Sequence, residues 1–131
     1  MELTNSLSHH ERLRSRGSIR RLFESGKSGF VYPLRYVWFS EPATVSHSEP
    51  LVEAEVLFTV PKRFHKRANR RNLLRRRVKE SYRLQKSLLL DSASEPQMVD
   101  IAIIYSTKEQ KSYKTINNAV RKILENIAKD L

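Results

Sequence analysis

One dense run of arginine and lysine residues is the part of this chain best suited to chemistry. Residues 62–86 contain twelve basic side chains and a single acidic one, Glu80. This segment holds the whole formal net charge of +11, because the other 106 of the 131 residues contain thirteen basic and thirteen acidic side chains. Guanidinium groups bind phosphates by charge and by paired hydrogen bonds. The segment therefore predicts a polyanionic partner, with nucleic acid favoured over a membrane surface.

The other side chains indicate no catalytic site within the protein. The absence of cysteine excludes a disulfide framework, a thiolate metal site and a cysteine nucleophile. No histidine pair has metal-ligand spacing, and surface positions are predicted for all four histidines, His9, His10, His47 and His65. The acidic residues form no pair of the kind that holds two metal ions in a nuclease, and no phosphate-binding glycine motif is present. We therefore expect no catalytic residue and no protein metal site.

The basic segment must be positioned by a helix, predicted over about residues 68–90. On a helical wheel one face contains Leu74, Val78, Ser81, Gln85 and Leu88, flanked by Tyr82, Leu84 and Leu89. The opposite side contains Arg71, Asn72, Arg75, Arg76, Lys79 and Arg83. Arg70 and Arg77 lie toward the apolar side, so either their long side chains extend to reach water or these residues are not inside a regular helix. One face is therefore expected to pack on a sheet while the other presents a basic surface.

This helix suits RNA better than DNA or a membrane. Apart from Asn72 it lacks the amide and small residues that read base edges in a DNA groove. A strand ending at Pro61 precedes it, instead of the short helix of a helix-turn-helix unit. No Trp or Phe lies between Arg67 and Leu90, as a helix on a membrane surface would require. No apolar run is long enough to span a bilayer and no signal peptide is evident, so a cytoplasmic location is expected.

The remaining patterns predict one α/β (α+β) sandwich domain over residues 12–131, after a flexible leader at residues 1–11. A short amphipathic helix begins at about Ser15 or Ser18 and stops at Gly26. Strands are predicted at residues 30–40, 51–60 and 99–105, loops at 41–50 and 91–97, and a final helix at 112–129 with Ser112 or Thr115 as its cap. The order is helix, two or three strands, helix, strand, helix, with a mixed sheet of about four strands.

The strand at residues 30–40 suggests a second nucleic-acid surface. Leu34, Tyr36 and Trp38 share one face, which we assign to the core. Arg35, Val37 and Phe39 share the other face, and the arginine indicates that this face is at least partly open. Ile19 and Phe23 of the first helix could form its wall. Aromatic and cationic groups in such a groove suit single-stranded nucleic acid, whose bases stack on side chains.

The segment from Val60 to Tyr82, VPKRFHKRANRRNLLRRRVKESY, resembles the protein component of bacterial ribonuclease P. It is similar to the family pattern of a strand ending in V-S-K-[KR], then an alanine, then R-N-R-x-[KR]-R-x-x-[KR]-E. The matching residues are Val60, Lys62, Arg63, Ala68, Arg71, Asn72, Arg75, Arg76, Lys79 and Glu80. Upstream, Arg12-Leu13, Ile19, Leu22-Phe23 and Gly26 resemble the family's R-L…F-x-x-[VI]-F-x-x-G. The likeness covers about residues 12–128.

The resemblance implies a mechanism in which the catalyst is an RNA. That RNA holds Mg²⁺ and removes the 5′ leader of precursor tRNA, while the protein assists and is not catalytic alone. The partners implied are the ribonuclease P catalytic RNA and the precursor tRNA leader, with no obligate protein partner. The fold implied has an arginine-rich central helix and a left-handed crossover, against the usual right-handed rule.

The resemblance also assigns residues. On the matching pattern and its basic flanks, RNA-binding roles fall on Lys62, Arg63, Lys66, Arg67, Arg71, Asn72, Arg75, Arg76, Lys79 and Arg83. The upstream motif assigns Phe23, with Ile19, to the leader groove, and counting from Gly26 without gaps places Arg35 and Val37 there as well. Leu73 departs from the pattern where an arginine is usual, and Arg70 or Arg77 could supply that contact instead. Two alternatives stay open: another RNA-binding module, ribosomal or chaperone in type, and a protein nuclease or transferase with its own carboxylate cluster.

Overall fold

The computed structural model describes residues 16–43, 52–93 and 95–131. The elements are α1 (Arg16–Ser25), β1 (Lys27–Val31), β2 (Leu34–Pro42), β3 (Val52–Thr59), α2 (Ala68–Gln85), α3 (Ser87–Leu90), β4 (Gln97–Tyr105) and α4 (Tyr113–Lys129). This order confirms the predicted sequence of helix, three strands, helical segment, strand and helix. The predicted leader lies outside the described residues, as do His9, His10 and His47.

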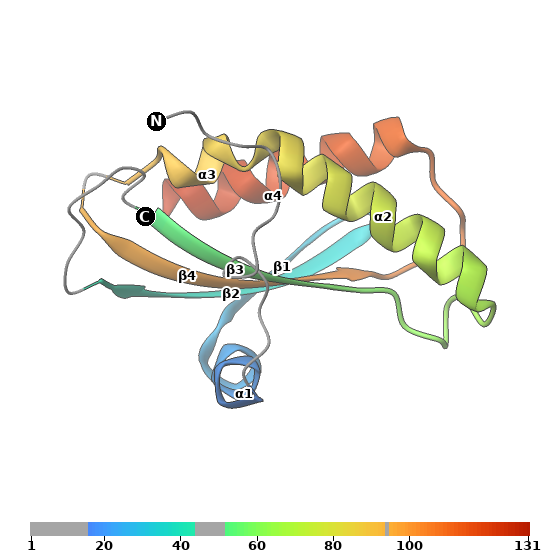
Figure 1. Ribbon diagram of the computed structural model, residues 1–131, viewed down its shortest axis with the longest axis horizontal. Coiled ribbons are helices and arrows are strands. Elements are labelled where there is room, and N and C mark those ends of the chain that lie inside the picture. The colour runs from blue at the N-terminus through green and yellow to red at the C-terminus, as the bar shows by residue number, and fades with distance from the viewer. Residues whose placement is uncertain (1–15, 44–51, 94) are drawn as a thin grey trace.

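The four strands form one mixed sheet in the order β1-β2-β4-β3. β2 is antiparallel to both β1 and β4, whereas β3 and β4 are parallel. Helices α2, α3 and α4 cover one face of the sheet, and α1 lies on the other (Figure 1). The predicted sandwich is therefore confirmed, with a layer of three helices on one face and a single short helix on the other.

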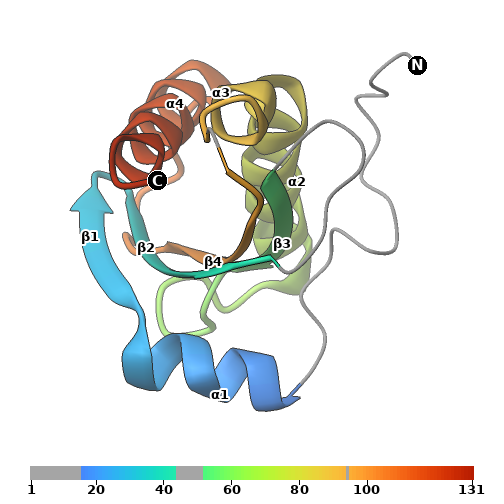
Figure 2. The same cartoon turned by 90° about the vertical axis from the view of Figure 1, so that its left-hand side faces the viewer.

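The crossover from β3 to β4 has the left-handed sense. In Figure 2 the sheet is seen from the end where β3 and β4 begin, with α2 and α3 above it. Both strands run away from the viewer, and the chain passes from β3 through α2 and α3 to β4 on its left (Figure 2). A right-handed connection would place the second strand on the right. The handedness that the resemblance implies is therefore present.

The main core lies between the sheet and the helices α2 to α4. Strand β4 is central, and its residues Ile101, Ala102 and Ile103 are all nearly inaccessible to water. Complete burial of an isoleucine side chain such as Ile101 or Ile103 stabilises the fold by roughly 1.5–3 kcal/mol. Helix α4 begins where predicted, because the Ser112 hydroxyl accepts a hydrogen bond from the backbone N–H of Thr115 at 3.3 Å. The whole predicted stripe of α4 is buried: Ile116, Ala119, Val120, Ile123, Leu124 and Ile127.

The prediction of a single strand over residues 30–40 is wrong. The chain turns at Tyr32 and Pro33, and the segment forms a hairpin of β1 and β2 in which Phe30 pairs with Arg35. Proline has no N–H to donate to a ladder, so it disfavours an uninterrupted strand here. Strand β2 also extends to Pro42, into the region predicted as a loop. The hairpin supplies the fourth strand of the sheet.

The prediction of one uninterrupted helix over residues 68–90 is also wrong. A turn at Lys86 divides it into α2 and α3, and Lys86 itself is buried. The turn changes the direction in which the last residues point, so Leu89 and Leu90 enter the core. Leu88, which the wheel placed on the apolar face, is 43% exposed. Before the turn the wheel is accurate for Leu74, Val78, Ser81 and Tyr82, which are buried. Leu84, which the wheel placed beside the apolar face, is 49% exposed, so that part of the prediction is wrong.

Candidate nucleic-acid interface

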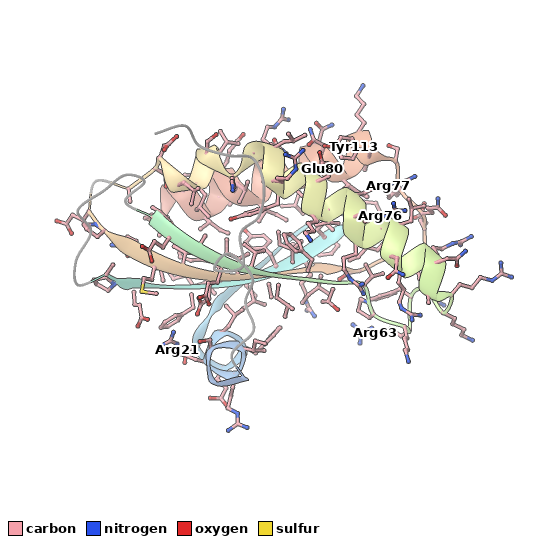
Figure 3. All side chains as sticks on the ribbon, in the orientation of Figure 1. Arg21, Arg63, Arg76, Arg77, Glu80 and Tyr113 are labelled. Carbon is pink, nitrogen blue, oxygen red and sulfur yellow. The ribbon has the colours of Figure 1, made fainter. Side chains whose placement is uncertain are left out.

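Helix α2 carries most of its basic side chains on the side facing away from the sheet. Arg67, Arg70, Asn72 and Arg76 are exposed, and Arg71, Arg75, Lys79 and Arg83 are half-buried. Lys62, Arg63 and Lys66, in the loop that precedes the helix, are exposed. In Figure 3 Arg76 lies on α2 and Arg63 lies at the end of the molecule where α2 begins. The structure thus brings the ten predicted RNA-binding residues to one helix and its leading loop.

The start of α2 is electrostatically unfavourable in the free protein. Arg67 is at the N-cap without a side-chain cap, and the first turn contains no acidic residue. The N-terminus of a helix already has partial positive charge and favours anions, yet here cationic residues surround it. An anionic partner would relieve this repulsion.

Some of these side chains also have structural contacts. Arg71 donates from Nη1 to the backbone carbonyls of His65 at 3.1 Å and Lys66 at 2.7 Å, which holds the loop against the helix. Arg75 donates to the Asn72 side chain at 3.1 Å. Arg83 is paired with Glu80, and the hydrogen bond from Arg83 lowers the pKa of that carboxyl. These contacts orient the basic surface.

Arg77 has a different role from its neighbours. Its Nη1 donates to the backbone carbonyl of Lys111 at 2.6 Å, which joins α2 to the loop before α4. The wheel placed Arg77 toward the apolar side, and this bond explains how its charge is accommodated there. Arg70, by contrast, is exposed. Of the two arginines suggested as substitutes for the contact missing at Leu73, Arg70 is the one open to a partner.

His65 is buried, so the prediction of a surface position for it is wrong. Only 3% of the residue is exposed, and Nε2 lies 2.8 Å from the backbone carbonyl of Thr107. Its ring meets the ring of Tyr105 edge-on at 5.5 Å. The sequence did not reveal this role, because His65 lies among basic residues that are themselves exposed. His65 anchors the loop of residues 61–67 to the end of β4.

The second predicted surface is the sheet face on which α1 lies. Val37 and Ala102 form a small cluster there with Leu22, and Ile19 packs against its edge. Tyr36 and Trp38 are buried on the opposite face, which confirms their assignment to the core. Val37 is only 8% exposed, so it supports α1 more than it offers contact area.

The other two predicted groove residues are accessible on this face. Phe23 of α1 is 50% exposed. Arg35 is exposed and lies next to Ile104 of β4 and Phe30 of β1 in the sheet register. Phe30 is 57% exposed and was absent from the predicted groove. In an unbroken strand Phe30 would share the core face with Tyr36. The two-residue turn instead pairs Phe30 with Arg35, which places its side chain on the α1 face.

Charge divides the α1 face of the sheet into two ends. Toward the starts of β3 and β4 lie Asp100, Glu41, Glu53 and Glu55, and Arg21 bonds Glu41 at 3.3 Å and Asp100 at 3.4 Å. Toward the opposite end lie Arg35 and, beyond β3, Lys62 and Arg63. Figure 3 shows Arg21 beside α1 and Arg63 at the end where α2 begins. Phosphate groups are favoured only at the Arg35 end.

Residues 16–43, 52–93 and 95–131 contain neither a metal-binding cluster nor a helix that could span a membrane. No group of three or more His, Asp or Glu side chains there is arranged to hold a metal ion. We therefore assign no step to a metal held by these residues. None of the helices within those ranges has the length and apolar character needed to cross a membrane.

Comparisons with known proteins find relatives that match nearly the whole chain. The sequence profile of the family Ribonuclease P matches residues 7–128. A ribonuclease P protein component of Porphyromonas gingivalis is 36% identical over 126 residues, covering 95% of this chain and 88% of the relative. One of Chlorobaculum tepidum is 30% identical, covering 95% of this chain and 84% of the relative.

Solved structures show the same fold. The RNase P protein from Thermotoga maritima superposes with a TM-score of 0.64 at 23% identity, covering 88% of this chain and 96% of that one. The Staphylococcus aureus RNase P protein gives 0.59 at 16% identity, covering 89% and 94%. With the profile match and the curated relatives, these findings show that the chain belongs to the family of bacterial ribonuclease P protein components.

Proposed function

We propose that this protein binds the catalytic RNA of ribonuclease P through α2 and its leading loop, and assists that RNA in removing the 5′ leader of precursor tRNA. The observation that carries the proposal is the position of the basic side chains. They lie on the outward side of one helix while its opposite side is buried in the core. The surface is thus preorganised for a phosphate backbone.

The protein would supply positive charge where two polyanions must approach each other. Neutralising phosphates lowers their repulsion, and this effect weakens as salt screens it. The leader would lie against the α1 face of the sheet, near Phe23 and Arg35. In this proposal the Mg²⁺ ions used in cleavage are held by the RNA, and the protein lowers the concentration of Mg²⁺ that the RNA requires.

A cleavage assay with the catalytic RNA tests the proposal. The purified protein alone should not cleave precursor tRNA, and at low Mg²⁺ it should accelerate leader removal by the RNA. The double variant Arg75→Gln/Arg76→Gln should lose most of this stimulation, whereas Lys122→Gln/Lys129→Gln on α4, with the same net charge, should keep it. No stimulation by the wild-type protein would refute the proposal. Equal affinity of the RNA–protein complex for precursor and mature tRNA would favour a general RNA-binding module instead.

A further inference from the structure

Phe30 is an exposed aromatic side chain that the fold leaves in an unusual place. It is on β1, an edge strand, and its exposed fraction of 57% exceeds that of every other large hydrophobic side chain reported for the described residues. The hairpin register sets it opposite Arg35, on the same sheet face as α1. Burial in the core therefore does not explain it.

The ring of Phe30 has one aromatic neighbour in the free protein. It contacts the ring of Tyr32 edge-on, with centroids 6.3 Å apart. Tyr32 is itself anchored, because its hydroxyl donates to Glu109 at 2.7 Å and the Lys111 ammonium lies 5.1 Å from its ring centroid. The contact with Tyr32 restricts the Phe30 ring, which reduces the side-chain entropy that Phe30 would lose when a partner binds.

The neighbours of Phe30 form one row across all four strands. The register aligns Phe30 with Arg35, Ile104 and Thr59. This row contains one cation and no acid. On this face a new row follows at every second residue of each strand. In the second row after that of Phe30, Phe39 is aligned with Asp100 and Glu55, and the third row contains Glu41 and Glu53. A phosphate chain is therefore attracted to the Phe30 row and repelled from the far end.

Helix α1 separates these two ends. The intervening row contains Val37 and Ala102, which are covered by packing against Leu22. A strand of RNA that reaches this face near Phe23 thus finds α1 on one side and the row from Thr59 to Phe30 on the other. Its favourable path crosses the β-strands toward the edge of the sheet and does not follow them into the acidic rows.

We propose that Phe30 is a base-stacking residue that extends the single-strand site from α1 to the edge strand β1. One leader base stacks on the Phe30 ring while Arg35 neutralises an adjacent phosphate. The inference rests on the proposed function and names a residue that determines leader affinity within it. Base–aromatic stacking of this kind tolerates any base, so the contact recognises the presence of a leader and not its sequence.

The test measures the affinity of the RNA–protein complex for precursor tRNA and for mature tRNA. Phe30→Ala should weaken binding of the precursor about five-fold or more, the lower range for loss of one stacking contact. Affinity for mature tRNA should be unchanged. Phe30→Tyr keeps a ring and should bind as the wild type does. Met98→Ala, which removes another exposed apolar side chain from the acidic end of the same face, is the matched control and should have no effect.

Leader length provides a second readout that a purely structural role would not change. With leaders shortened from the 5′ end, the penalty of Phe30→Ala should vanish once the leader no longer reaches β1. Equal loss of affinity for precursor and mature tRNA, or no loss for any leader, would overturn the role of Phe30. If the wild-type protein still stimulates leader removal in that case, the proposed function stands and only this inference fails.

Discussion

At the scale of single residues, Asp100 shows how the fold changes an ordinary side chain. It lies on the central strand β4 with only 7% of the residue exposed. Burial raises the pKa of its carboxyl, and the Arg21 guanidinium at 3.4 Å opposes this shift only in part. A carboxyl whose pKa is higher in the folded than in the unfolded chain binds more protons when folded. Stability is therefore lost as pH rises from the unfolded pKa through the folded one.

Replacing Asp100 by asparagine should remove this loss. We expect the free energy of unfolding of Asp100→Asn to equal or exceed that of the wild type at pH 7. The difference between the two proteins should grow as pH rises from about 4, the ordinary pKa of Asp. Urea unfolding over a pH series measures it. Glu53→Gln, at an exposed position on the same face, is the control and should follow the wild type. If Asp100→Asn instead becomes less stable than the wild type as pH rises, the ion pair with Arg21 stabilises the charged carboxylate by more than burial destabilises it.

Gly26 is required by close packing where α1 joins β1. A Cβ atom at this position would lie 2.3 Å from the backbone carbonyl oxygen of Leu22 and 2.9 Å from that of Trp38. Backbone atoms cannot move aside as a flexible side chain can, so Gly26→Ala should lower the free energy of unfolding by about 1–3 kcal/mol. Chemical denaturation provides the measurement. Gly17→Ala, at an exposed position within α1, should cause no loss because alanine favours a helix.

At the scale of elements, α2 assigns different tasks to adjacent arginines. Arg76 is exposed on the outward side, whereas Arg77 reaches back to the Lys111 carbonyl and connects α2 with the start of α4. Successive residues are about 100° apart around a helix, so neighbours in sequence face different surroundings. The three consecutive arginines at residues 75–77 therefore serve two functions: Arg76 is available to a partner, and Arg77 holds α2 against the loop before α4.

Methionine at each of these two positions should separate the functions. Arg77→Met should lower the free energy of unfolding by about 1–3 kcal/mol, because the partly buried carbonyl of Lys111 loses its charged donor. Its affinity for the catalytic RNA should stay within about two-fold of wild type. Arg76→Met should unfold like the wild type within about 0.5 kcal/mol. Its RNA affinity should fall, and the slope of log affinity against log salt should flatten by about one.

Filter binding over a salt series, together with thermal denaturation, measures both effects. If Arg76→Met destabilises the protein as much as Arg77→Met does, then the assignment of the outward side of α2 is incorrect. If Arg77→Met weakens RNA binding more than Arg76→Met does while leaving stability intact, the bond to Lys111 is not what holds Arg77.

At the scale of the whole molecule, the charge is unevenly distributed over a fold that is otherwise neutral. The segment of residues 62–86 accounts for the formal +11, and its like charges repel one another in the free protein. This repulsion acts at the end of the molecule where α2 begins, and salt screens it over about 10 Å at 0.1 M. Repulsion between these charges thus destabilises the free protein, and an RNA partner would neutralise them.

Salt should therefore stabilise the free protein. The midpoint of thermal unfolding should rise when NaCl increases from about 0.05 M to 0.5 M, because the Debye length shortens over that range. The variant Arg75→Gln/Arg76→Gln should respond less, and Lys122→Gln/Lys129→Gln should respond as the wild type does. An equal response in all three proteins would mean that salt acts on burial of apolar surface and not on the basic segment.

The sequence alone determined the family, the order of the elements apart from the β1–β2 hairpin, and the basic side of α2. These features depend on local patterns: alternation in β3, the helical spacing that buries Leu74 and Val78, and the cap at Ser112. Tertiary structure alone decided the rest, namely the burial of His65, the inward bond of Arg77 and the exposure of Phe30. Each depends on a contact between segments far apart in the chain or on a turn that reverses strand alternation. A single-residue shift in where a turn falls moves every following side chain to the other face of the sheet, and local spacing does not reveal it.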